Sequence, residues 1–128
     1  MNLILPISSC RANLSAIQTS LEITVQQEPS ALMERLNELS SLLGTSAQVL
    51  SSYQFHVDTA RLNAVTIAKR EGYSGNMAKD FIEGTCAEIR AEMKLAERQN
   101  AALVHSIESV RSILSFTKSE LYHSNTQR

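Results

Sequence analysis

Two long series of apolar residues constrain the fold of this 128-residue chain more than any other feature. In the C-terminal series, residues spaced alternately by four and three positions are apolar at ten of twelve places, whereas a hydrophobic content of 43% would give about five. This spacing is typical of the seam of a long helix that packs against another helix. The series consists of Ile82, Cys86, Ile89, Met93, Ala96, Asn100, Leu103, Ile107, Val110, Leu114, Thr117 and Leu121.

The second seam has the same spacing and the same length. It consists of Leu32, Leu36, Leu39, Leu43, Ser46, Leu50, Tyr53, Val57, Ala60, Ala64, Ile67 and Glu71, and a shorter stripe of Cys10, Leu14, Ile17 and Leu21 precedes it. We therefore predict one helical domain over residues 1–128, with helices at about 8–26, 29–71 and 75–122.

Residues that favour helix caps and turns lie between these series, at the predicted helix boundaries. Ser8 or Ser9 can cap the first helix, and Pro29 suits the first turn of the second. Residues 72–76 (GYSGN) form the clearest turn, with Ser74 as a cap for the third helix. Gly44 and Gly84 lie inside helices, but a mid-helix glycine costs only about 1 kcal/mol, so we expect both helices to continue. The polar residues 123–128 are expected to fray.

The predicted fold class is all-α. Two long helices joined by a short turn must form an antiparallel hairpin. The first helix is less than half as long, so it can cover only the half remote from the turn. The remote half is then a three-helix bundle, and the turn-side half has two helices only.

Ser46 and Asn100 interrupt the two seams with polar side chains. With the turn centred near residue 73, the two residues fall at the same level, and Cys10 and the first-helix serines are expected there too. A buried polar layer costs stability but can fix register or oligomeric state. The alternative is a water-filled end to the region that the first helix covers.

Composition narrows the function classes. The net charge is −1 with acids and bases interleaved, which does not favour nucleic-acid binding. Two cysteines do not make a disulfide framework, and Cys10 and Cys86 should lie about 20 Å apart, so both are expected to be structural. No leader and no membrane-length apolar run is recognised. We expect a soluble cytoplasmic protein.

No catalytic, cofactor or metal constellation is found in the sequence, so we expect a non-enzymatic protein without cofactors. A di-iron bundle needs repeated Glu-x-x-His pairs on inward faces. Only Glu120 and His123 have that spacing, while His105 precedes Glu108 in the opposite order and His56 stands alone.

Several apolar residues are expected to face outward, where two helices alone cannot bury them. They are Phe55, Leu62 and Val65 on the second helix, and Leu95 and Phe116 on the third. This pattern favours self-association, most simply as a two-fold dimer. The alternative is a set of scattered surface apolar residues, which are common.

Residues 9–16 (SCRANLSA), 32–39 (LMERLNEL) and 95–101 (LAERQNA) resemble small uncharacterised all-helical proteins of Bacteroides-type bacteria, often found in prophage or other mobile regions. The resemblance implies a bacterial, cytoplasmic protein and brings no activity with it. Residues 100–107 and Leu114 are also similar to the client-binding C-terminal helix of flagellar export chaperones.

Three hypotheses follow. The first is a helical interaction or structural protein that self-associates through the turn-side part of its hairpin. The second is a small export or assembly chaperone that binds a client helix. The third is an accessory nucleic-acid-binding protein of a mobile element that uses Arg61, Lys69, Arg70 and Lys79.

Overall fold

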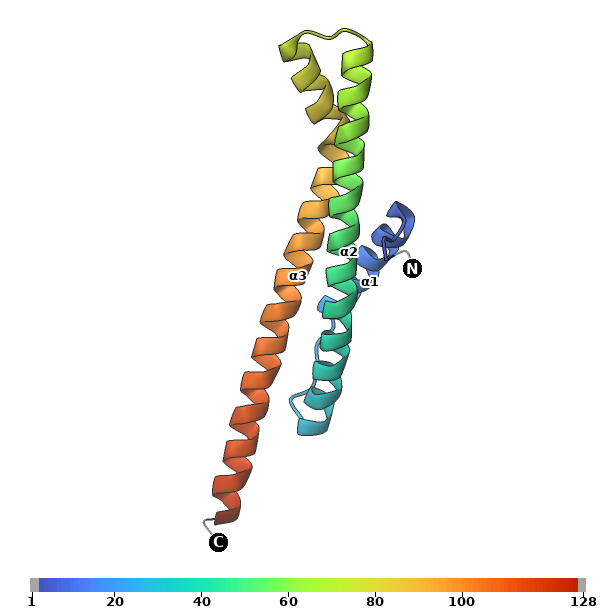
Figure 1. Ribbon diagram of the computed structural model, residues 1–128. Coiled ribbons are helices and arrows are strands. Elements are labelled where there is room, and N and C mark those ends of the chain that lie inside the picture. Colours follow the sequence, from blue (N-terminus) through green and yellow to red (C-terminus); the bar gives the residue numbers. More distant parts are fainter. Residues whose placement is uncertain (1–2, 127–128) are drawn as a thin grey trace.

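The computed structural model describes residues 3–126, with side chains up to residue 123, and those residues form three helices and no strand. α1 (Ile7–Leu21) is followed by α2 (Pro29–Arg70) and α3 (Gly75–Thr126). α2 and α3 run antiparallel, and α1 packs against both near the middle of the hairpin (Figure 1). The predicted all-α hairpin with a shorter N-terminal helix is confirmed.

α1 begins directly after Pro6, not at a serine cap. The Pro6 carbonyl accepts the amide of Cys10 at 3.0 Å, so Ser8 and Ser9 fall inside the helix, and no side-chain cap is present. The ring of Pro6 fixes its φ, here −59°, and so holds the backbone where the helix begins. The prediction of a serine cap was wrong.

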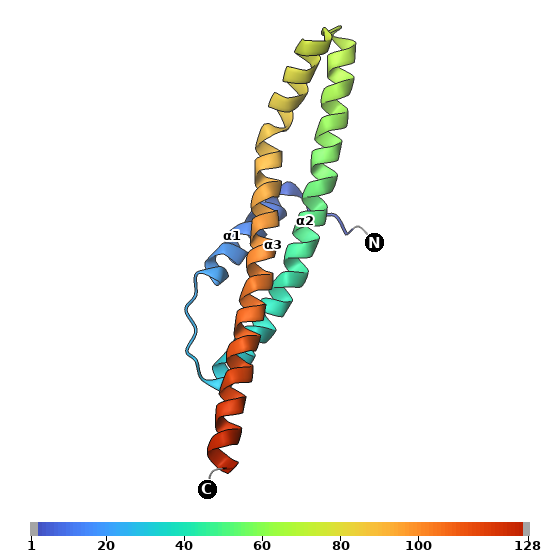
Figure 2. The same ribbon diagram turned by 90° about the vertical axis from the view of Figure 1, so that its left-hand side faces the viewer.

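α1 also ends at Leu21, so its predicted extension to about residue 26 was wrong. Residues 23–28 have no regular structure and form a linker that continues from the end of α1, away from the α2–α3 turn, to the start of α2 (Figure 2). Ile23, Thr24 and Val25 are β-branched, and such side chains lose rotamer freedom in a helix. A similar triplet at residues 65–67 continues inside α2, so β-branching weakens the helix here but does not end it alone.

In the turn between α2 and α3, the predicted glycine ends one helix and the predicted serine caps the next. Gly72 has φ +68°, and the amide of Tyr73 donates back to the carbonyl of Ala68 at 3.1 Å, which is a Schellman closure of α2. The Ser74 hydroxyl then accepts the amide of Met77 at 3.4 Å and caps α3. Both helix ends are therefore determined by local chemistry.

α3 continues to Thr126, beyond the predicted end at about residue 122. The fraying expected for residues 123–128 stays a prediction, and residues 127–128 lie outside the described part of the chain. The last seam position, Leu121, is 54% exposed. Ser46 and Asn100 lie opposite each other in the antiparallel pair. Counting along both helices from that contact, Pro29, the first residue of α2, lies opposite Thr117. The end of α3 therefore projects beyond α2 (Figure 1), and the three-helix bundle predicted for the half remote from the turn does not reach the last position of the seam.

The core consists of two clusters. One, remote from the turn, contains Ile17, Leu32, Leu39, Leu103, Ile107, Val110 and Leu114. The other, nearer the turn, contains Cys10, Leu14, Val49, Tyr53 and Ala96. All of these belong to the predicted seams and stripe except Val49, which lies beside its seam.

The part of the hairpin from about residue 57 to residue 88, here called the turn-side segment, has no third helix over it (Figures 1 and 2). Its buried apolar side chains are mostly small: Val57, Ala64, Ala68 and Cys86. Small side chains let two helices approach closely and bury each other without further cover. The predicted two-helix extension is present.

The two mid-helix glycines provide a stability test. Both helices run through Gly44 and Gly84, and a Cβ added at either position meets nothing within 4 Å. We expect Gly44→Ala and Gly84→Ala each to raise the free energy of unfolding by about 1 kcal/mol, because alanine loses less backbone entropy. Urea denaturation followed by circular dichroism measures this.

The matched control is Gly72→Ala. Its φ of +68° is strained for any residue with a side chain, so this variant should lose about 1 kcal/mol although it also has open space around it. A loss of stability in Gly44→Ala or Gly84→Ala would contradict the continuous helices.

Candidate functional site

Ser46 and Asn100 form a polar layer between the two core clusters. Asn100 Nδ2 donates to Ser46 Oγ at 3.2 Å, Ser46 is buried, and Asn100 is half-buried. The structure therefore brings together the two polar interruptions that the sequence places at one level. Their hydrogen bond partly offsets the cost of placing polar groups between two apolar cores.

Gln99 extends this layer toward α1, and the sequence analysis did not identify it. It is buried, and its Nε2 donates to the carbonyl of Leu14 at 2.8 Å, while its Oε1 is buried without a hydrogen-bond partner. The residue adjoins a seam position, and this is the only signal that the sequence offered.

Cys10 does not lie in the polar layer, so that expectation was wrong. It belongs to the cluster nearer the turn, with Tyr53 and Ala96. The reason is the segment before α1: the amide of Leu5 donates to Ser52 Oγ at 2.9 Å, which places the start of α1 more than a turn beyond Ser46.

The segment of residues 3–6 acts as a strap across α2. The carbonyl of Leu5 accepts His56 Nε2 at 2.7 Å, and the carbonyl of Leu3 accepts Gln48 Nε2 at 3.3 Å. Together with Ser52, these side chains satisfy the backbone of a segment that has no secondary structure of its own.

Beneath the strap lies a cluster of titratable side chains. Arg11 Nε on α1 pairs with Glu92 Oε1 on α3 at 2.7 Å. Glu92 Oε2 and the hydroxyl of the fully buried Tyr53 have no hydrogen-bond partner. Burial, followed by the negative charge of Glu92, raises the pKa of Tyr53 to about 12.

The thiols do not have the surroundings of a nucleophile. Burial, and then the charge of Glu92, raises the pKa of Cys10, and its Sγ donates to the carbonyl of Leu5 at 3.7 Å. His56 donates to the same carbonyl, so it is not placed to take the thiol proton. A reactive cysteine requires a lowered pKa and access to solvent, and Cys10 has neither. Cys86 is also free and fully buried.

A buried arginine fastens the other end of α1, and the sequence analysis did not single it out. Arg35 on α2 is 6% exposed and donates to both the hydroxyl and the carbonyl of Ser20, at 3.0 and 2.7 Å. Glu38 lies 3.2 Å from the guanidinium and balances its charge. The Ser20 carbonyl also accepts the amide of Ile23 at 3.1 Å, so Arg35 is its second donor. A cation at the C-terminal turn of α1 complements the helix dipole.

The predicted outward apolar residues do not share one setting. Phe55 and Leu62 on α2 are 50% and 67% exposed, and Val65 is half-buried. Leu95 lies beside α1, where it lines a groove with Leu14 and Gln18. Of these four residues, only Phe55 and Leu62 form an outward pair, two helical turns apart on α2. Phe55 lies just before the turn-side segment, and Leu62 lies within it.

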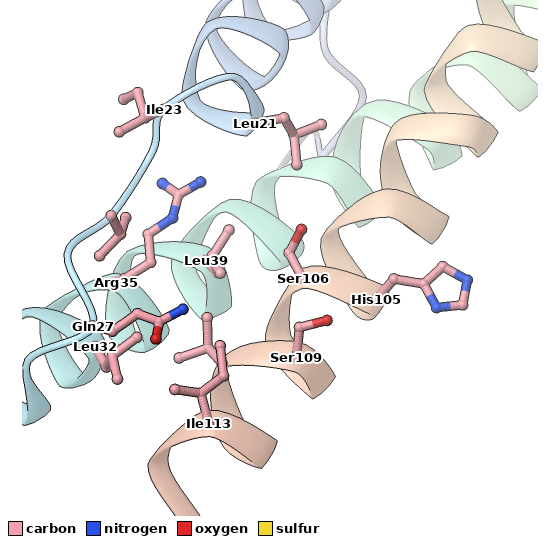
Figure 3. A pocket seen from close by; sticks show the side chains of 12 residues that line it. Leu21, Ile23, Gln27, Leu32, Arg35, Leu39, His105, Ser106, Ser109 and Ile113 are labelled. Carbon is pink, nitrogen blue, oxygen red and sulfur yellow. The ribbon is translucent and has the colours of Figure 1, made fainter. Parts of the chain in front are cut away.

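A groove of about 300 Å³ lies under the linker, between the end of α1, the start of α2 and α3 (Figure 3). Leu32, Leu39 and Ile113 contribute apolar walls, and Ser106 and Ser109 add hydroxyls from α3. His105 points away from it, toward Glu108 at 3.8 Å (Figure 3).

Within the described residues, no three His, Cys, Asp or Glu side chains come close enough together to hold a metal ion. The same part of the chain contains no helix of the length and hydrophobicity that a membrane crossing requires.

Comparison with protein-family models, with curated proteins and with solved structures finds no match for this chain.

The cost of the polar layer can be measured with Asn100→Leu combined with Ser46→Ala. The pair removes both polar groups together and joins the two apolar clusters, so we expect the free energy of unfolding to rise by about 1–2 kcal/mol. Thermal unfolding by circular dichroism measures the gain. Ser46→Ala alone, which leaves the Asn100 amide without its partner, should lose stability, and a folding failure of the double variant would contradict this view.

Tyr53→Phe tests the buried hydroxyl. The pKa of Tyr53 is about 12 when folded and about 10 when unfolded, so wild-type stability should fall as the pH rises above 10, by about 2–3 kcal/mol at pH 12. Tyr53→Phe removes the titrating group, so this variant should not show the alkaline loss. At pH 7 its stability should change by less than about 1 kcal/mol, because the hydroxyl interacts with Glu92 without a well-formed hydrogen bond. Denaturation of both proteins at pH 7 and at alkaline pH measures the difference, and an equal alkaline loss in both would contradict it.

Proposed function

We propose that this chain is a non-enzymatic helical interaction protein of a bacterial cytoplasm, and that it self-associates as a dimer through the turn-side segment. The observation that carries the proposal is the exposure of Leu62 within the turn-side segment, by 67%, and of Phe55 just before that segment, by 50%. The two free cysteines, both buried, suit a reducing compartment.

The geometry of the segment supports pairing with a second copy. Residues 57–70 of α2 extend about 20 Å, which is long enough for two hairpins to pack as a short four-helix section. Burying a phenylalanine or leucine side chain contributes about 1.5–3 kcal/mol to the free energy of association. In a two-fold dimer each residue is buried in both copies, so it contributes twice. Met77, near the start of α3, is also exposed.

The second candidate is a chaperone that binds a client helix, and the groove under the linker favours it. The residues that resemble a client-binding helix include Leu103, Ile107 and Leu114, which are buried in the core remote from the turn. A client would reach them only after α1 moved away. We therefore place this function second.

Light scattering on a gel-filtration column at micromolar concentration tests the proposal. The wild type should elute as a dimer, and Phe55→Glu or Leu62→Glu should give a monomer with an unchanged melting temperature measured at low concentration, since both side chains are exposed. A wild-type monomer at these concentrations would overturn the proposal.

Leu121→Glu is the matched control. Leu121 is comparably exposed but lies at the far end of α3, so this variant should stay dimeric. If it dissociates as readily as Leu62→Glu, the contact does not lie on the turn-side segment.

A further inference from the structure

Three buried side-chain polar atoms among residues 3–123 have no hydrogen-bond partner, and all three belong to residues that meet α1. They are the hydroxyl of Tyr53, Oε2 of Glu92 and Oε1 of Gln99. Tyr53 shares a core cluster with Leu14 of α1, and Gln99 donates to the Leu14 carbonyl. Glu92 pairs with Arg11 of α1. Native proteins have few buried polar atoms without a partner, so the surface under α1 is unusual.

These atoms show what α1 does not supply. The oxygens of a carboxylate and a carboxamide accept hydrogen bonds, so they need donors. Toward Gln99, α1 presents the carbonyl of Leu14 and, at 3.4 Å, the side-chain oxygen of Gln18, and both of these are acceptors. The side-chain nitrogen of Gln18 donates to Glu22 instead. A helix that brought a donor to Gln99 would fit this surface better than α1 does.

α1 is attached in a way that lets it leave. It has no side-chain N-cap, and at 15 residues it is too short to be stable alone. The linker of residues 23–28 is exposed except at Val25, and it joins α1 to the far end of α2 (Figure 2). The Ser46–Asn100 bond and the turn at Gly72, which fix α2 against α3, include no residue of α1. The hairpin therefore keeps this surface when α1 moves away.

Arg35 gives the same surface a contact that any helix can use. Its guanidinium donates to the carbonyl of Ser20 in the last turn of α1. The last four carbonyls of every α-helix lack an intrahelical donor. A different helix in this place would offer Arg35 the same kind of acceptor, and Glu38 would stay beside Arg35 on α2.

We infer that the α1-binding surface, defined by Arg35, Tyr53, Glu92 and Gln99, binds an amphipathic helix of another protein that displaces α1. The helix has apolar residues at the spacing of the α1 stripe and an arginine or lysine that reaches Gln99. It is the client that the second candidate function requires, and the inference does not rest on the turn-side dimer.

α1 of a second copy is not this occupant. It has the same missing donors, so it gains nothing over the chain's own α1. A short linker also holds that own α1 at an effective concentration of about 1 mM, far above the micromolar concentration of a second copy. Only a helix that fits better can take its place.

Peptides of residues 5–22, measured by fluorescence anisotropy, test the inference on the full chain. The chain carries Ile17→Ala, which weakens its own α1 because Ile17 is buried in the core. We expect the native peptide to bind saturably and the Gln18→Arg peptide to bind about five-fold more tightly, through the added donor to Gln99. With Gln99→Leu also in the chain, the two peptides should bind alike.

The Ala12→Arg peptide is the matched control. It adds the same charge at a position that is exposed on α1, so it should bind like the native peptide. The inference is overturned if no peptide binds up to about 1 mM, or if Gln18→Arg gains no more than Ala12→Arg. It is also overturned if the gain persists in the Gln99→Leu chain.

Hydrogen exchange of the wild-type chain gives a readout that does not depend on the folding of Ile17→Ala. The Gln18→Arg peptide at about 1 mM competes with an α1 held at a similar concentration, so the α1 amides should exchange faster. Unchanged exchange in α1 would show that it is not displaced and would overturn the inference. Leu62→Glu, which should separate the dimer, should leave the peptide affinity unchanged, so the two proposals are tested separately.

Discussion

The register of α2 against α3 is the constraint on which the other contacts of this protein depend. A slip by seven residues would keep apolar residues facing each other, but it would separate Asn100 from Ser46 and leave the half-buried amide of Asn100 without its partner. The turn fixes the same register from the opposite end, through the left-handed Gly72 and the Ser74 cap. Two independent devices thus select one alignment from several that hydrophobic burial alone would allow.

The place of α1 follows from that register. At 15 residues, α1 is too short to be stable as an isolated helix, so it depends on the surface that the hairpin offers. Its apolar stripe supplies the burial, and polar contacts at each end decide its position. Ser52 holds the strap before the helix, and Arg35 holds its last turn. The hairpin therefore orders the N-terminal region more than the N-terminal region orders the hairpin.

The spacing of apolar residues was sufficient to predict the helices, their antiparallel pairing and nearly all of the core. A helix that buries one face has apolar residues at every third or fourth position, and this spacing is visible in the sequence. It could not predict Arg35 or Gln99, since their roles depend on which carbonyl of α1 comes within reach after folding. The level of Cys10 was missed for a related reason: the strap that determines it is held by hydrogen bonds to α2, which leave no periodic pattern in the sequence.

The unequal burial along the hairpin has a consequence for its dynamics. The two core clusters contain leucine, isoleucine, valine and tyrosine, whereas the turn-side segment buries mainly alanine and a cysteine, which remove much less apolar area from water. The segment can therefore open without disturbing α1 or either cluster, as a sub-global unit with its own amide-exchange behaviour. A ligand or second copy that binds there acts on the least stable part of the molecule, and it would slow exchange in that part first.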